Sequence, residues 1–66
     1  MIREALIKKL EGEVAALEAD LQTFFNSPTQ AVPDHINYVG TAEKKLGELS
    51  STKGKLVTLK RIKEAE

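Results

Sequence analysis

Apolar side chains recur at spacings of three and four residues through the first part of this chain. That spacing places them on one face of an α-helix, at the a and d positions of successive heptads. The residues of this stripe are Ile7, Leu10, Val14, Leu17, Leu21 and Phe24, with Leu6 and Phe25 widening it. A long apolar stripe on one helix needs a second helix to cover it, so the predicted fold class is all-α.

We expect a single domain over residues 1–66 that folds as an antiparallel two-helix hairpin. The expected elements are a helix at residues 2–25, a loop at 26–33 and a helix at 34–64. Pro28 and Pro33 indicate the loop, and Asp34 is a suitable N-cap residue directly after the second proline. A second possible helix start is Thr41, which follows Gly40.

The second helix is also expected to have an apolar face. This face consists of Tyr38, Ala42, Leu46, Leu49 and Leu56, with Val39 and Val57 at one edge and Lys53 inside the stripe. At 1.5 Å per residue this helix would be ~45 Å long and the first ~36 Å. Its C-terminal end should therefore overhang, leaving Leu56, Leu59 and Ile62 in need of cover.

The chain is short, and a chain of this length buries a smaller fraction of its surface than a typical domain and is only marginally stable alone. It has 66 residues, no cysteine and a single histidine, His35. Disulfides and cysteine-ligated zinc are therefore excluded, and one histidine cannot form a metal site alone. We expect a homo-oligomer, in the first place a dimer that forms a four-helix bundle. In architecture alone this resembles the Rop-like helical-hairpin dimers.

Three glycines stand seven residues apart in the second predicted helix, at Gly40, Gly47 and Gly54. Each should cost the helix roughly 1 kcal/mol relative to alanine, and the spacing aligns all three on one face. The first helix holds a matching series, which consists of Ala5, Gly12 and Ala19. We expect these residues to form a face for close helix packing in the oligomer. The alternative is that the glycine face is simply exposed to solvent.

The same face also permits a small anionic ligand, because hydroxyls and lysines without bulky neighbours suit phosphate oxygens. The candidate contacts are Lys44, Ser51, Lys55 and Thr58, with the Tyr38 hydroxyl as a further candidate. The Pro33-Asp34 opening of the second helix is loosely similar to small phage proteins that sequester cyclic nucleotide signals with helical hairpins. That resemblance implies a nucleotide held between subunits.

Charge is balanced overall but unevenly divided. The chain has ten basic and ten acidic residues, and residues 1–34 sum to −3 whereas residues 35–66 sum to +3. Zero net charge disfavours a membrane or nucleic-acid partner, and an acidic half facing a basic half suits an antiparallel hairpin or a head-to-tail assembly.

The sequence contains no convincing catalytic arrangement, because His35 has no suitably placed nucleophile. We therefore expect a non-enzymatic protein without a cofactor, located in the cytoplasm. The first interpretation is a small protein-interaction or assembly module that acts as a homo-oligomer, such as a phage-type regulator or inhibitor. The alternatives are sequestration of a small anionic ligand between subunits and, third, a nucleic-acid-binding accessory role.

Overall fold

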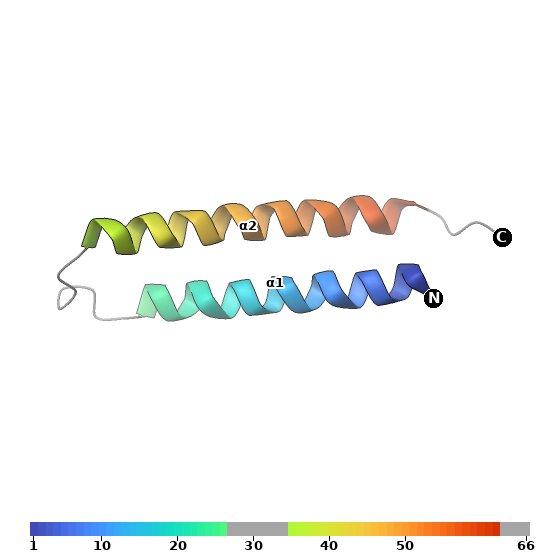
Figure 1. Cartoon of the computed structure of the whole chain (residues 1–66), viewed down its shortest axis with the longest axis horizontal. Coiled ribbons are helices and arrows are strands. Elements are labelled where there is room, and N and C mark those ends of the chain that lie inside the picture. The colour runs from blue at the N-terminus through green and yellow to red at the C-terminus, as the bar shows by residue number, and fades with distance from the viewer. Residues whose placement is uncertain (27–34, 63–66) are drawn as a thin grey trace.

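The computed structural model describes residues 1–26 and 35–62, which form two helices (Figure 1). These are α1 (Ile2–Asn26) and α2 (His35–Arg61). They lie side by side and antiparallel, so that the first turn of α1 is level with the last turn of α2. The predicted all-α hairpin is confirmed.

Both ends of α1 agree with the sequence to within one residue. The helix α1 runs through Asn26, and α2 continues without interruption through Gly40, so a separate start at Thr41 is excluded. The predicted N-cap at Asp34 and the rest of the predicted loop lie outside the described residues. At its other end α2 ends at Arg61, and the Ile62 N–H donates to the Leu59 carbonyl at 3.1 Å in a tighter closing turn. Residues 63 and 64 of the predicted helix lie outside the described residues.

The predicted overhang of the second helix is wrong for the described residues. The helices have 25 and 27 residues and are therefore of nearly equal length. Arg3 of α1 reaches across to the end of α2, where its Nε donates to the Ile62 carbonyl at 3.2 Å and its Nη2 to the Lys60 carbonyl at 3.4 Å. These carbonyls lack partners within the helix, and a cation is favourable at a helix C-terminus. Leu56 and Leu59 consequently lie within the hairpin, half-buried, whereas Ile62 is 58% exposed and lacks cover as the sequence predicts.

The a and d positions of α1 form its side of the contact between the helices, as the sequence predicts. Leu10 and Leu21 are buried, and the other four members of the stripe are half-buried: Ile7, Val14, Leu17 and Phe24. We call the line of side chains between the two helices the seam. At the end where α1 finishes, the Phe24 and Tyr38 rings close the seam, with centroids 4.7 Å apart and planes tilted by 58°.

The face that α2 turns to α1 differs from the predicted one. It consists of Tyr38, Ala42, Lys45, Leu49, Thr52, Leu56 and Leu59, each buried or half-buried. Predicted members Leu46 and Lys53 are instead exposed, as are the predicted edge residues Val39 and Val57.

The physical reason is that two heptad lines share Ala42, Leu49 and Leu56. One continues through Lys45, Thr52 and Leu59, and the other through Leu46, Lys53 and Lys60. The second line would place both Lys53 and Lys60 in the seam, whereas the first line places only Lys45 there, and burial of a charged group is costly. The first line buries the Thr52 hydroxyl, which is satisfied because it donates to the Glu48 carbonyl at 2.8 Å.

Truncation of Leu49 should test how strongly the hairpin depends on its seam. Leu49→Ala removes a buried side chain and should lower the free energy of unfolding by about 2–5 kcal/mol. Since a small domain has little stability to lose, we expect most of the helical circular dichroism signal to disappear at 25 °C. The matched control is Ser50→Ala at the exposed neighbouring position, which should melt like the parent chain. A Leu49→Ala protein that also melts like the parent would contradict this account of the seam.

Candidate functional site

The glycine stripe of α2 faces away from α1. Gly40, Gly47 and Gly54 take the f position when the seam residues take a and d, and all three are exposed. A Cβ atom built on any of them meets nothing within 4 Å outside its own helix. Within one chain this face is therefore open, and close packing of another helix against it stays a prediction about an assembly.

The matching small residues of α1 occupy the equivalent outer position. Ala5, Gly12 and Ala19 are exposed, and they too fall at f when the α1 seam residues take a and d. The two small-residue stripes thus lie on opposite outer sides of the hairpin. A single chain does not bring them together, so any contact between them requires a second chain.

Four of the five candidate contacts for an anionic ligand share one side of α2. Lys44, Ser51, Lys55 and Thr58 are all exposed there, at the helical spacing that the sequence predicts. Tyr38 lies elsewhere, because it is half-buried in the seam against Phe24. Ligand binding by the four stays a prediction, and the structure does not bring Tyr38 to them.

Ion pairs cross the seam, and in each the carboxylate comes from α1 and the lysine from α2. The N···O distances are 3.2 Å for Lys53–Glu18, 3.2 Å for Lys45–Asp20 and 3.4 Å for Lys60–Glu11. This confirms that the acidic half of the chain faces the basic half in an antiparallel hairpin. Each exposed pair contributes only about 0.2–1 kcal/mol, so the pairs define the alignment of the helices more than their stability.

Two lysines, Lys9 and Lys55, act on the Glu13 carboxyl. Lys9 donates to its carboxylate at 2.7 Å, one helical turn away. That hydrogen bond and the Lys9 charge lower the pKa of the Glu13 carboxyl below its ordinary value of 4.5, and Lys55 of α2 adds a smaller effect in the same direction.

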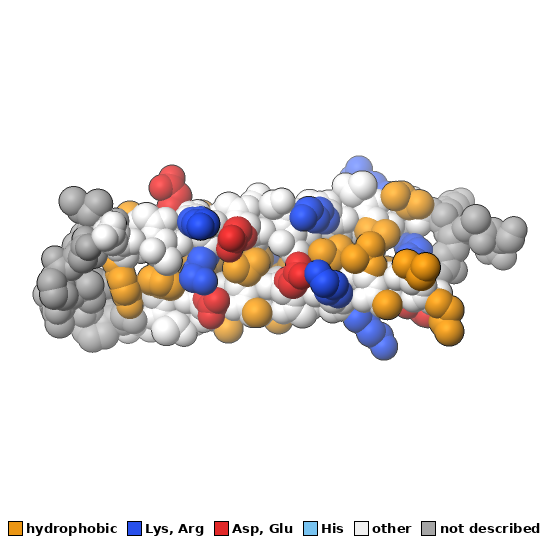
Figure 2. Space-filling model, in the orientation of Figure 1, with side chains coloured by type: hydrophobic (Ala, Val, Ile, Leu, Met, Phe, Trp, Pro, Cys, Tyr) orange, Lys and Arg blue, Asp and Glu red, His pale blue; other side chains and the backbone are white. Residues whose placement is uncertain are grey.

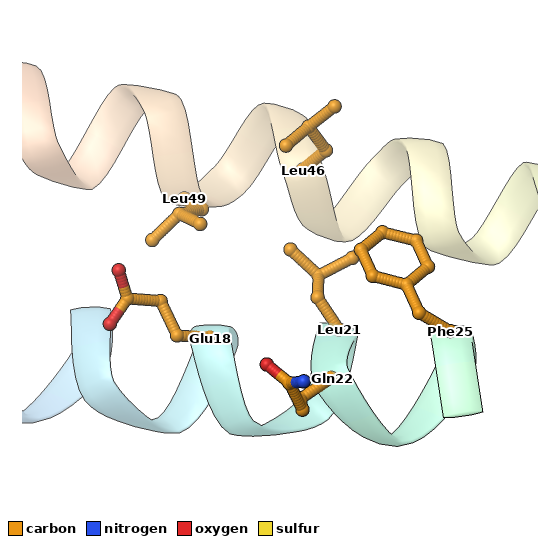
Figure 3. A pocket seen from close by; sticks show the side chains of 6 residues that line it. All are labelled: Glu18, Leu21, Gln22, Phe25, Leu46 and Leu49. Atoms are coloured by element: carbon orange, nitrogen blue, oxygen red, sulfur yellow. The ribbon is translucent and has the colours of Figure 1, made fainter. Parts of the chain in front are cut away.

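One edge of the hairpin has large apolar side chains that neither helix covers. We call it the apolar edge, and it consists of Phe25, Val39, Leu46 and Val57, which are 70%, 56%, 54% and 52% exposed. Phe25 and Leu46 flank an open, shallow groove of about 370 Å³ whose floor is formed by Leu21 and Leu49 (Figure 3). The sequence predicts Leu46 to lie in the core. Leu46 belongs, however, to the same heptad line as Lys53 and Lys60, and this shared line could have indicated that Leu46 lies at the edge.

Further apolar side chains gather at the end of the hairpin where α1 begins. Met1, Ile2, Leu6 and Ile62 are exposed there. Figure 2 shows hydrophobic side chains at this end and along the line between the helices, with charged side chains beside them. Both ends of the hairpin therefore present apolar surface.

Two further features were sought in the described part of the chain, a metal-binding cluster and a membrane-spanning helix. Residues 1–26 and 35–62 contain no group of three or more His, Cys, Asp or Glu side chains arranged to hold a metal ion. Neither described helix has a stretch long and apolar enough to cross a membrane. No protein-family model, curated protein or solved structure gives a significant match to the chain.

The lowered pKa of Glu13 gives a prediction with a definite sign. A carboxyl with a depressed pKa in the folded state stabilises the fold above its unfolded pKa, and this contribution is lost as the pH falls below about 4.5 through the folded pKa. A ¹³C NMR titration of Glu13 should therefore show a midpoint below 4.5. Lys9→Gln should move the midpoint back up, whereas Lys8→Gln should leave it in place. An unchanged midpoint in Lys9→Gln would refute the assigned cause.

Alanine at the outer glycines should stabilise the protein. Because a Cβ meets open space at Gly47 and Gly54, Gly47→Ala and Gly54→Ala should each raise the free energy of unfolding by about 0.5–1 kcal/mol. Chemical denaturation with both variants and their double variant checks this. A lower stability in either variant would show that the glycine face is tightly covered in solution.

Proposed function

We propose that this chain is a non-enzymatic helical hairpin that associates with copies of itself and serves as a protein-interaction or assembly module. The observation that carries the proposal is the contrast between buried and exposed apolar side chains. The buried ones among the described residues are Leu10, Leu21 and Leu49, whereas the four members of the apolar edge are each more than half exposed.

Covering these side chains supplies stability that the hairpin does not obtain alone. Full burial of a large apolar side chain contributes about 1.5–3 kcal/mol, so covering even part of the apolar edge is substantial for a chain of this size. The chain has no cysteine from which to form a disulfide instead. A second hairpin is the simplest cover, and two hairpins make a four-helix bundle.

The character of the exposed groove supports binding rather than catalysis. Its lining is mainly apolar, and the polar side chains that line it are Glu18 and Gln22. A groove of this kind accepts an apolar side chain from a partner. We include in the proposal a regulator or inhibitor role of the phage type, exercised by covering a partner protein's surface, and a cytoplasmic location.

The two other candidate functions have less support. A nucleic-acid partner would compete with α1 for the lysines, because Lys45, Lys53 and Lys60 already pair with α1 carboxylates. Sequestration of an anionic nucleotide relies on Lys44, Ser51, Lys55 and Thr58, which share an exposed side of α2. Their arrangement permits phosphate binding without requiring it.

Sedimentation equilibrium combined with thermal melting tests self-association. The sedimenting mass should be a multiple of the 7.3 kDa chain mass. The melting temperature should rise with protein concentration, because association stabilises the folded state by mass action. A monomeric mass together with a melting temperature that does not depend on concentration would contradict the proposal.

A further inference from the structure

We infer that the second copy packs on the apolar edge, with the twofold axis of the dimer running along the helices. In this arrangement the two connection ends, where Asn26 and His35 lie, are at the same end of the four-helix bundle. Each α1 then lies antiparallel to α2 of the other copy. This inference rests on the proposed self-association and adds the surface and the orientation.

The first reason is the uneven distribution of apolar and charged side chains along this edge. Phe25, Val39 and Leu46 occupy its connection half. On the same edge Glu18 lines the groove beside Leu46 and pairs with Lys53, and the pair Glu11–Lys60 follows toward the other end. An axis along the helices places each half against the same half of the second copy, so apolar meets apolar and charged meets charged. An axis across the helices would instead place Val39 and Leu46 of α2 against Lys60 and Lys53 of the second copy's α2 and desolvate these lysines.

The second reason is charge complementarity between the copies. With the axis along the helices, α1 of one copy faces α2 of the other. The row of Glu11 and Glu18 then faces a row of lysines, Lys53 and Lys60, from the second copy. With the axis across the helices, α1 would face α1, and carboxylates would oppose carboxylates. Like charges held opposite each other are unfavourable, so the first arrangement is preferred.

The third reason is size. At 1.5 Å per residue and a diameter of about 10 Å per helix, the side of the hairpin measures roughly 40 by 20 Å. Its area is therefore on the order of 800 Å² for each copy, which is typical of a specific protein–protein interface. Val57, the fourth member of the apolar edge, lies nearer the other end of the hairpin and would be covered as well, whereas Gly47 and Gly54 would remain on the outside of the bundle.

Distances between spin labels on the two copies test the orientation, and the absence of native cysteine makes single-cysteine labelling straightforward. Asn26→Cys marks the connection end of α1 and Ala5→Cys the other end, both at outer, exposed positions. The sites are 21 residues apart on α1, which corresponds to ~32 Å along the helix. Pulsed dipolar spectroscopy gives the distance between two Asn26 labels in one sample, and between Asn26 and Ala5 labels of different copies in a mixed sample.

The inferred dimer requires the Asn26–Asn26 distance to be the shorter of the two. The reverse order, or equal distances, would overturn the orientation while leaving self-association intact. A monomeric mass with no dipolar signal between copies would instead overturn the proposed function and this inference together.

A pair of neighbouring substitutions tests the surface itself. Leu46→Glu places a carboxylate on the apolar edge and should raise the dimer dissociation constant at least about tenfold. Gly47→Leu adds a larger side chain at the adjacent outer position and should leave the dissociation constant within about twofold of the parent value. If Gly47→Leu abolishes the dimer and Leu46→Glu does not, the copies associate through the glycine stripe and the inference is wrong.

Discussion

The limited burial available between two helices is the constraint on which the rest of this structure depends. In a hairpin each helix has one neighbour, so the a and d side chains receive cover and those at the flanking positions receive little. The seam accordingly buries Leu10, Leu21 and Leu49 while Phe25 and Leu46, directly beside it, stay largely exposed. A chain of this length and without cysteine has few other means of gaining stability. The self-association that we propose would supply the cover that two helices alone do not give these side chains.

Charge has a different role in this hairpin. The pairs Lys53–Glu18 and Lys60–Glu11 each contribute little energy, yet they favour one face of α2 over another and one alignment of the helices. Arg3 acts in the same way by donating to carbonyls at the end of α2. These contacts specify the arrangement of the seam, and apolar burial stabilises it. The same edge thus has a row of carboxylates on α1 and a row of lysines on α2, and a second copy in the inferred orientation would place opposite charges against both rows.

The sequence predicted the fold and the seam of α1 well, because the apolar stripe of that helix has a single continuous heptad line. It predicted α2 less well, because Ala42, Leu49 and Leu56 belong to two lines at once. Apolar character alone favours Leu46 over Lys45, and the choice between the lines depends on which lysines lie opposite the α1 carboxylates. That information belongs to the pair of helices and is absent from the periodicity of either one. The sequence did not predict the end of α2 at Arg61 for a similar reason. The contacts at this end come from the other helix, because Arg3 of α1 donates hydrogen bonds to carbonyls there.

The candidate surface was accessible to sequence reasoning only in part. Phe25 and Leu46 stand out as apolar residues, but their exposure follows from the position of the seam. The small-residue stripes were found by spacing, and the structure adds that they lie on opposite outer sides of one hairpin. The spacing of residues along one helix shows on which face each residue lies. It does not show whether that face contacts another helix, another chain or solvent.

Native mass spectrometry of the protein, purified under non-denaturing conditions from the cells that express it, tests the central claim most directly. It reports the number of chains in the assembly and any retained small molecule in one spectrum. The account predicts a dimer whose mass is that of two chains with nothing added. A spectrum of monomers across the accessible concentrations would contradict the account, and an oligomer with a retained mass of nucleotide size would favour ligand sequestration in its place.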